Sequence, residues 1–278
     1  ALAQVKSRIH ATSQVPAKKT RFITYCQRIA AILLLPAIIA IVALMMKKDH
    51  QEPLIAYNEV TAPYGMVSSL TLPDSSKVWL NAGSTLKYPA AFTSNVREVE
   101  MSGEAYFEVH ADKEHPFIVN TGDLKVTATG TAFNICSFAK AQEEVITLVT
   151  GKVAVSQENN IKHLLPGQQL NYQRASKSME ITDIDTYKYI SWKDGILAFR
   201  DDPLKSIFNR LEQVYQVRFI LKDTSINQFT YRATFKGETL DEILDYMGMS
   251  IPITFRTTET EKEGNDSINV RTIEVYKN

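Results

Sequence analysis

The longest uninterrupted apolar stretch of the chain runs from Ile29 to Met46 and contains no charged side chain. Its eighteen residues would span about 27 Å as a helix, close to the thickness of a bilayer core. The stretch therefore predicts a membrane-spanning helix. A buried core helix and a cleaved signal peptide are the alternatives, but a signal peptide needs a small-residue cleavage site, and Met46 is followed by Lys47 and Lys48.

Basic residues are distributed unevenly about this helix. Lys47 and Lys48 follow it, whereas six precede it: Lys6, Arg8, Lys18, Lys19, Arg21 and Arg28. Because positive charge favours the cytoplasmic side, residues 1–28 are predicted to be a cytoplasmic stub, and the chain after about residue 49 is predicted to lie outside. Pro36 lies in mid-span and removes a backbone donor, which could expose a peptide bond to an intramembrane protease. Proline is also common in spanning helices without that role, and we favour this simpler interpretation.

Between about residues 58 and 182, apolar and polar side chains alternate over short distances. Five odd-numbered positions from Val99 to Val109 are apolar, whereas Glu100, Glu104 and Glu108 occupy even positions, as in a half-buried strand. This pattern places all three glutamates on the polar face. Other short apolar runs, separated by turn residues, lie at 67–72, 78–81, 117–120, 124–128, 133–136, 145–149 and 153–156. They predict an all-β domain that is a sandwich, a barrel or a solenoid-like stack, and periodicity does not choose among these.

From about residue 190 to the end, the apolar spacing becomes helical. The first helix is predicted to follow Asp202 as N-cap, with Pro203 at its first position, and its apolar face comprises Leu204, Ile207, Phe208, Leu211 and Tyr215. In the second helix, Thr239 and Glu242 have the spacing of a capping box, and the apolar face comprises Leu240, Ile243, Leu244 and Met247.

A constant offset of 36 residues relates these two helices and the strands around them. Phe199 corresponds to Phe235 before the helices, and Val217 and Phe219 correspond to Ile253 and Phe255 after them. Each repeat has the order strand, helix, strand. Residues 190–278 are therefore predicted to form a small α/β domain from a duplicated βαβ unit, with a further strand at 267–276.

Composition and motifs give little indication of catalysis. Lys+Arg and Asp+Glu both number 31, so nothing suggests electrostatic capture of nucleic acid. Cys26 and Cys136 would be separated by the membrane, which excludes a disulfide framework. No zinc-binding or nucleotide-binding motif includes any of the histidines, which are His10, His50, His110, His115 and His163. The segment 110–116, with Asp112 and Glu114, is interpreted as a solvated loop without a functional role. We assign no catalytic, cofactor-binding or metal-binding residue.

Several motifs resemble those of FecR-type anti-sigma regulators. Residues 72–84 read LPDSSKVWLNAGS and residues 103–109 read GEAYFEV, and further matches follow in the family's order at 116–119, 130–135, 151–155 and 165–169. Ser75 stands where the family's turn usually has glycine. Residues 192–199, followed by Asp202 to Leu204, are similar to the family's C-terminal module, which is related to the signalling domains of TonB-dependent transporters.

The resemblance implies a non-enzymatic regulator without a cofactor in the inner membrane. A nutrient-loaded TonB-dependent outer-membrane transporter would offer its N-terminal signalling domain to the periplasmic body, which controls a cytoplasmic sigma factor, and periplasmic and intramembrane proteases are further implied partners. The family's sigma-binding domain precedes the spanning helix, and residues 1–28 correspond to a missing or truncated form of it. We place partner binding in residues 190–278, by strand addition to an exposed sheet edge. The alternative is a membrane-anchored periplasmic glycan-binding module or enzyme on the all-β scaffold, with Glu100, Glu104 and Glu108 in a cleft.

Overall fold

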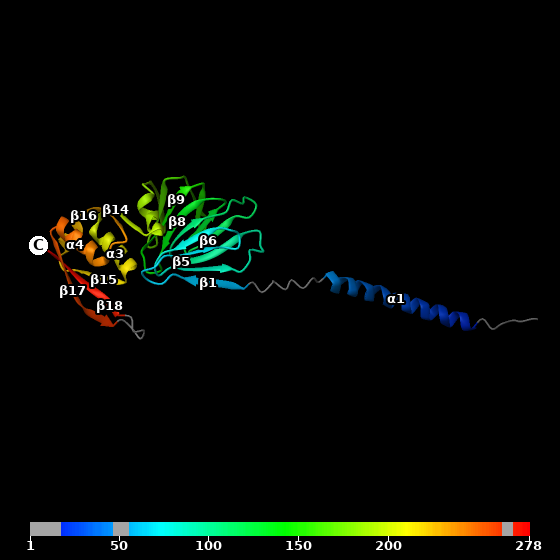
Figure 1. Cartoon of the computed structure of the whole chain (residues 1–278). Coiled ribbons are helices and arrows are strands. Elements are labelled where there is room, and N and C mark those ends of the chain that lie inside the picture. The colour runs from blue at the N-terminus through cyan, green and yellow to red at the C-terminus, as the bar shows by residue number, and fades with distance from the viewer. Residues whose placement is uncertain (1–17, 47–55, 263–268) are drawn as a thin grey trace, which may run out of the picture. The chain divides into compact units, whose positions relative to one another are not determined.

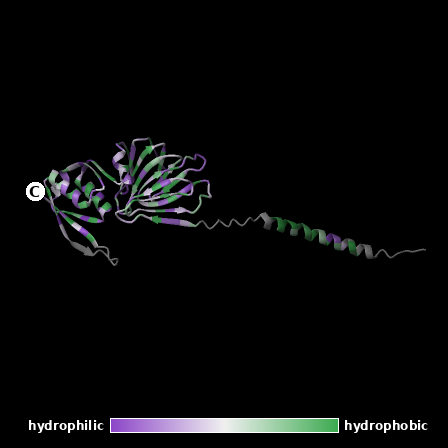
Figure 2. Cartoon of the chain, viewed as in Figure 1, coloured by the Kyte–Doolittle hydropathy of each residue, from purple (hydrophilic) through white to green (hydrophobic). Residues whose placement is uncertain are grey.

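The computed structural model describes residues 18–46, 56–262 and 269–278, and the chain divides into two compact units, residues 1–54 and 55–278. In the first unit, helix α1 spans Lys18–Met46 and includes the whole predicted span. Its segment Tyr25–Val42 is apolar and long enough to cross a membrane, and none of it is buried within the protein (Figure 2). Of the basic residues that orient the helix, Lys6, Arg8, Lys47 and Lys48 lie outside the described residues.

The second unit begins with thirteen strands (Figure 1). They are β1 Tyr57–Thr61, β2 Ser68–Thr71, β3 Lys77–Leu80, β4 Thr85–Pro89, β5 Arg97–Glu108, β6 Phe117–Asn120, β7 Lys125–Ala128, β8 Ala132–Ser137, β9 Glu143–Thr150, β10 Val153–Gln157, β11 Asn160–Leu164, β12 Gln168–Gln173 and β13 Ser178–Asp183. All seven of the apolar runs predicted as strands are strands. The more polar β1, β4, β11, β12 and β13 were not among them.

Strand β5 belongs to two sheets and joins them. Its first half lies between β4 and β6 in the order β11-β10-β7-β6-β5-β4-β1, and its second half lies between β3 and β8 in the order β2-β3-β5-β8-β9-β12-β13. Between the halves, Gly103 has φ +105°, and a Cβ there would overlap Ser84. One apolar core fills the nearly closed, barrel-like sheet. Of the three predicted alternatives, namely a sandwich, a barrel and a solenoid-like stack, this arrangement is nearest to the barrel, because most pairings are antiparallel and one strand is shared between the sheets.

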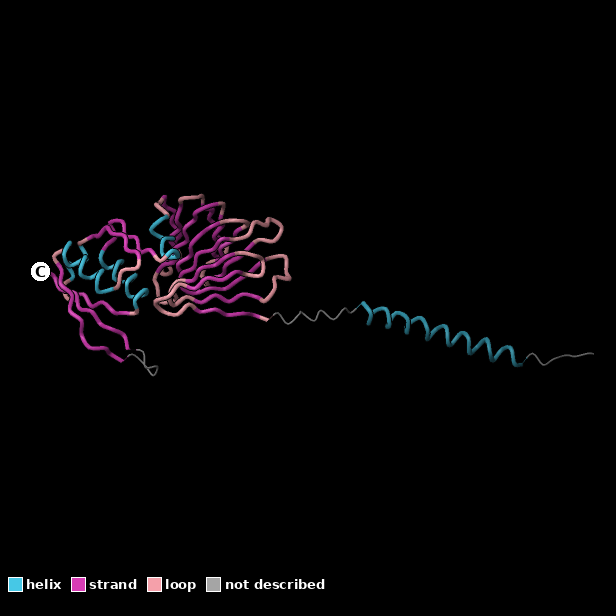
Figure 3. The backbone as a smooth tube through the Cα atoms, in the orientation of Figure 1, coloured by secondary structure: helices cyan, strands magenta, loops and turns pink. Residues whose placement is uncertain are grey.

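The C-terminal module contains short helices and strands in the order α2 Tyr187–Ile190, a 3-10 helix Ser191–Asp194, β14 Ile196–Pro203, α3 Leu204–Tyr215, β15 Val217–Leu221, a 3-10 helix Thr224–Gln228, β16 Thr230–Lys236, α4 Leu240–Ser250, β17 Ile253–Lys262 and β18 Asn269–Lys277. Helices α3 and α4 lie between two small sheets, β14-β16 and β15-β18-β17 (Figures 1 and 3). Phe208 of α3 stacks on Phe219 of β15 with ring centroids 4.7 Å apart. This second core is separate from that of the β-rich region.

The strand–helix–strand order occurs twice, but the duplicated βαβ arrangement is not confirmed. In a βαβ unit the two strands are parallel and belong to one sheet. Here β14 pairs antiparallel with β16, its counterpart in the other repeat, whereas β15 and β17 both pair with β18 on the opposite side of the helices. Each repeat therefore crosses the layers of the module, and the two strands of a repeat never become neighbours.

The predicted start of α4 is confirmed, whereas that of α3 is not. Thr239 and Glu242 form the capping box, in which the Glu242 carboxylate accepts the Thr239 N–H over 2.7 Å, as predicted. For α3 the prediction was wrong by one position, because Pro203 is the N-cap and the helix begins at Leu204. Pairing of β14 with β16 continues through Pro203, so Asp202 belongs to the strand, and its carboxylate binds Lys188 Nζ at 2.7 Å.

Candidate functional site

Residues 190–278, the predicted partner-binding region, contain two sheets, and each sheet ends in edge strands. Within the described residues, β15 and β17 each pair with β18 alone, and β14 and β16 pair with each other alone. An edge strand offers unpaired backbone donors and acceptors to a partner strand unless bulges or proline interrupt it. Strand β14 has such interruptions, because its register shifts between Phe199 and Asp202 and it ends in Pro203. Strand β17 is regular from Ile253 to Thr258.

The direction of the backbone groups in β17 follows from one hydrogen bond. The Asn278 N–H donates to the Pro252 carbonyl over 3.0 Å, in the register that continues as Thr254 opposite Tyr276. In an antiparallel pair, hydrogen-bonded positions alternate with positions whose N–H and C=O point away. Even-numbered residues of β17 therefore bond to β18, whereas Phe255 and Thr257 direct their N–H and C=O groups to the free edge.

A groove of about 390 Å³ borders this edge and is lined by residues of α4, β17 and β18. Leu244 and Phe255 form apolar parts of its wall, and Met249 is 83% exposed beside it. Arg271 also lines the groove. Its NH2 atom lies 2.6 Å from Asp241 Oδ1 and 3.0 Å from Thr257 Oγ1. The β17 edge thus combines available backbone groups with an adjacent surface for side chains.

A buried polar chain connects the module to the β-rich region. The Trp192 indole Nε1 donates to Asn134 Oδ1 over 3.1 Å, and Asn134 Nδ2 donates to Glu104 Oε1 over 3.0 Å. The second carboxylate oxygen, Glu104 Oε2, accepts a hydrogen bond from Asn81 Nδ2 over 2.7 Å. All four side chains are at most 8% exposed. Because a buried carboxylate must have its hydrogen bonds satisfied, this chain fixes the contact between the two regions.

The position of Glu104 corrects the sequence interpretation, which placed it on the polar face. Glu100 and Glu108 are exposed as expected, but every residue from Gly103 to Phe107 is buried. The outward face of the second half of β5 is covered, and Trp192, far along the chain, reaches Glu104 through Asn134. The three glutamates do not converge. Glu100 instead lies 3.2 Å from Lys87 Nζ, and no group of three or more metal-ligating side chains occurs in the described residues.

Arg210 of α3 and Cys136 of β8 lie close enough to interact electrostatically across the same junction. Burial, followed by the charge of Glu104, raises the pKa of the Cys136 thiol, and Arg210 opposes that shift. Arg210 NH1 donates to the Lys188 carbonyl over 3.2 Å, while its buried Nε and NH2 atoms have no hydrogen-bond partner in the part of the chain that the structure describes. Cys136 and Cys26 are both free cysteines.

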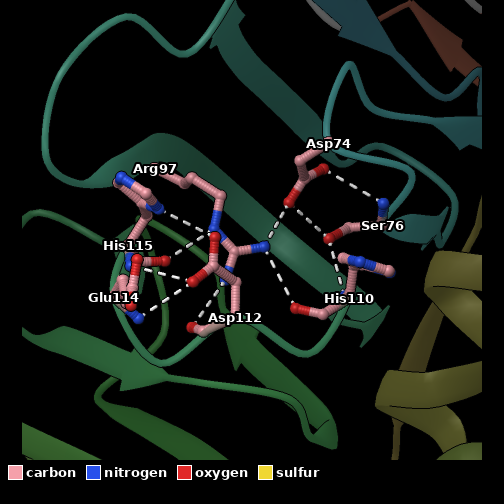
Figure 4. Close-up of polar contacts among 7 residues, drawn as sticks. All are labelled: Asp74, Ser76, Arg97, His110, Asp112, Glu114 and His115. Atoms are coloured by element: carbon pink, nitrogen blue, oxygen red, sulfur yellow. Dashed lines mark hydrogen bonds and ion pairs between the residues drawn. The ribbon is translucent and has the colours of Figure 1, made fainter.

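The histidine-containing segment 110–116 is organised around Arg97, which the sequence interpretation did not single out (Figure 4). The Arg97 guanidinium is buried, its NH1 lies 2.6 Å from Asp74 Oδ2, and it donates to the carbonyls of His110, Asp112 and His115. Asp74 also accepts from the Ser76 hydroxyl over 2.6 Å. His110 and His115 are themselves exposed, as a solvated loop predicts.

Within the same loop, Asp112 and His115 form an exposed pair. The hydrogen bond from His115 Nδ1 to Asp112 Oδ2, 2.8 Å long, lowers the pKa of that carboxyl to about 2, and the backbone N–H groups of Glu114 and His115 contribute. Asp112 therefore closes the turn as an acceptor. This arrangement stabilises the loop.

Two features of the sequence could have indicated the buried polar residues that the sequence analysis missed. Arg97 has the odd parity of Val99 and Met101, which predicts that it points into the core. After Gly103, the apolar residues Ala105, Tyr106 and Phe107 are consecutive, and this break in alternation indicates burial on both faces. No local pattern marks Asn81, Asn134 or Arg210, because their partners come from distant segments. The membrane-span residues Ile29, Pro36 and Met46 all lie in α1.

Comparison with known proteins agrees with this architecture. The family model described as FecR protein matches residues 58–160, and the model described as FecR, C-terminal matches residues 196–263. Two crystal structures from Parabacteroides distasonis, each described as an anti-sigma factor, are 29% identical to this chain with a TM-score of 0.68, covering 80% of this chain and 99% or 100% of theirs. No curated protein matches. With its β-rich region and its C-terminal module matched in order, the chain belongs to the FecR family of anti-sigma factors.

Proposed function

We propose that this protein relays a signal from a nutrient-loaded TonB-dependent outer-membrane transporter, across the periplasm and inner membrane, to a cytoplasmic sigma factor. Helix α1 is the membrane anchor, residues 1–28 face the cytoplasm, and residues 58–182 and 190–278 form two periplasmic domains. Membership of a regulatory rather than catalytic family supports this role. The apolar, unburied segment Tyr25–Val42 supports the anchor.

The transporter's signalling domain docks on residues 190–278 by adding a strand to β17. The observation that carries this proposal is the free edge of β17, where Phe255 and Thr257 direct unpaired backbone groups outward. Main-chain hydrogen bonds of an added strand supply affinity, and the adjoining groove with Met249 receives side chains that supply specificity. The β-rich region acts as a spacer or a second contact, held to the module by Trp192.

A proline at an outward-facing position tests this docking mode. Thr257→Pro removes the outward N–H without removing a donor to β18, because edge strands tolerate proline where the N–H faces solvent. Thr257→Val is the matched control, since both variants lose the hydroxyl contact with Arg271 and only proline loses the donor.

Purified residues 49–278 of each variant are titrated by calorimetry with the signalling domains of candidate transporters. We expect at least about tenfold weaker binding for Thr257→Pro than for Thr257→Val, at equal thermal stability. Equal affinity of the two variants would exclude strand addition at β17. Failure of every signalling domain to bind the unsubstituted protein would contradict the relay itself.

A further inference from the structure

A cavity of about 220 Å³ lies at the junction of the β-rich region and the C-terminal module. The β-rich region contributes the turn 65–67 and residues 81–82. The module contributes Trp192, Gly195 and Leu197, together with parts of α3 and β16 and the residues Gly237 and Glu238 that follow β16. The two regions have separate cores, and the cavity lies between them, with Leu197 and Phe235 of the module core in its wall.

The walls of the cavity are mainly apolar and aromatic. Trp192 and Phe235 are 2% and 6% exposed and form its inner part, whereas Met66 and Val67 are much more exposed and lie at its rim. Engineered apolar cavities of about 150 Å³ hold benzene, so the volume here suits one aromatic ring or a short alkyl chain. Such an occupant would replace water that the apolar walls can hydrogen-bond only poorly.

The negative charge of one lining residue favours an occupant that carries a positive charge beside its apolar part. Glu238 lines it, and its lining residues include no lysine, arginine or histidine. One carboxylate oxygen, Glu238 Oε2, accepts the Lys236 N–H, while Oε1 has no hydrogen bond within the described residues. Burial together with Glu238 and Glu242 raises the pKa of Tyr215, whose hydroxyl donates to the Glu238 carbonyl over 2.8 Å. The potential at this wall is therefore negative, and no ion pair of the described residues offsets the charge of Glu238.

We propose that the junction cavity is a binding site for a small amine with an apolar or aromatic body. The body lies among Met66, Trp192 and Phe235, and the ammonium group lies toward Glu238. A cation close to aromatic rings and a carboxylate gains from both. Because the two regions line the cavity together, an occupant holds them against each other. This inference does not depend on the transporter relay.

The probe is 2-phenylethylamine, and 3-phenylpropionate, which has the same ring and the opposite charge, is the matched ligand control. The full chain in zwitterionic lipid nanodiscs is titrated by calorimetry, with empty nanodiscs subtracted. Val67→Trp fills the cavity from its exposed rim, and Glu238→Gln removes the charge. Glu59→Gln, at an exposed position of β1, is the matched protein control.

We expect saturable binding of the amine, at least about tenfold weaker binding of the carboxylate, and a loss of about tenfold or more in both cavity variants but not in Glu59→Gln. Amine binding that survives both Val67→Trp and Glu238→Gln would place the ligand elsewhere. Equal binding of the two probes would remove the assignment to amines, and absence of saturable amine binding would overturn the site.

Discussion

The indole Nε1 of Trp192 lies 3.1 Å from Oδ1 of Asn134, and this hydrogen bond joins the C-terminal module to the β-rich region. The two residues are 58 positions apart in the chain, and both are nearly inaccessible to solvent. Through Asn134 the contact continues to Glu104. A signal received by residues 190–278 would therefore meet an ordered polar connection, rather than a flexible linker, on its way to the β-rich region.

Replacing Trp192 with phenylalanine should destabilise residues 55–278 by about 1–3 kcal/mol. Phenylalanine keeps an aromatic ring but lacks the indole N–H, so Asn134 Oδ1 loses its donor while staying buried. Trp79→Phe is the control, because Trp79 packs on Tyr106 through its ring, with centroids 5.6 Å apart. Urea denaturation, monitored by circular dichroism, gives the free energy of unfolding of both variants. Equal losses for the two substitutions would show that ring volume, rather than the hydrogen bond, determines the stability.

Replacing Glu104 with glutamine should cost about 1–3 kcal/mol, although the two side chains have the same shape. Both carboxylate oxygens accept amide N–H groups, from Asn81 and Asn134, and a glutamine NH2 would face one of those donors. Glu100→Gln, at an exposed ion pair, should change stability by less than about 1 kcal/mol. A neutral effect of Glu104→Gln would mean that the buried network is not formed as described.

Arg97→Met should be strongly destabilising, by about 3–5 kcal/mol, because it leaves the Asp74 carboxylate buried without its cation and removes three hydrogen bonds to the loop at 110–116. The exposed pair of Arg232 and Asp201 provides the comparison, and Arg232→Met should cost no more than about 1 kcal/mol. Thermal denaturation measures both variants, and equal melting temperatures of Arg97→Met and Arg232→Met would contradict this account.

Leu211→Ala and Met247→Ala should each cost about 2–5 kcal/mol, because both side chains are fully buried in the core of the module. If the β-rich region and the C-terminal module are separate domains, hydrogen exchange should show loss of protection in the described residues of the module while β5 to β9 remain protected. Simultaneous loss in both regions would indicate that the junction couples them into one cooperative unit.

Local sequence patterns predicted those elements whose own residues determine their burial. The alternation in the first half of β5, up to Ser102, and the capping box at Thr239 needed no distant partner, and both are confirmed. Strands β11 and β13 were missed because their side chains are largely exposed or half-buried, so that apolar runs do not mark them.

The candidate sites were less predictable, because tertiary contacts create them. Glu104 has the parity of a surface residue and becomes buried when Asn134 and Trp192 cover it. The repeat was visible as a 36-residue offset, but periodicity carries no information about which strands pair. The β17 edge and the junction cavity follow from that pairing, so neither could be read from the sequence.

The relay requires the body of the protein to lie outside the cytoplasm, and a pair of reporter fusions tests this most directly. An enzyme that is active only outside the cytoplasm is fused either after Asn278 or before Ala1 of the full chain, and its activity is measured in cells with equal expression of both fusions. The account predicts activity for the fusion after Asn278 and none for the fusion before Ala1. The opposite pattern would contradict the orientation of α1 and with it the proposed relay.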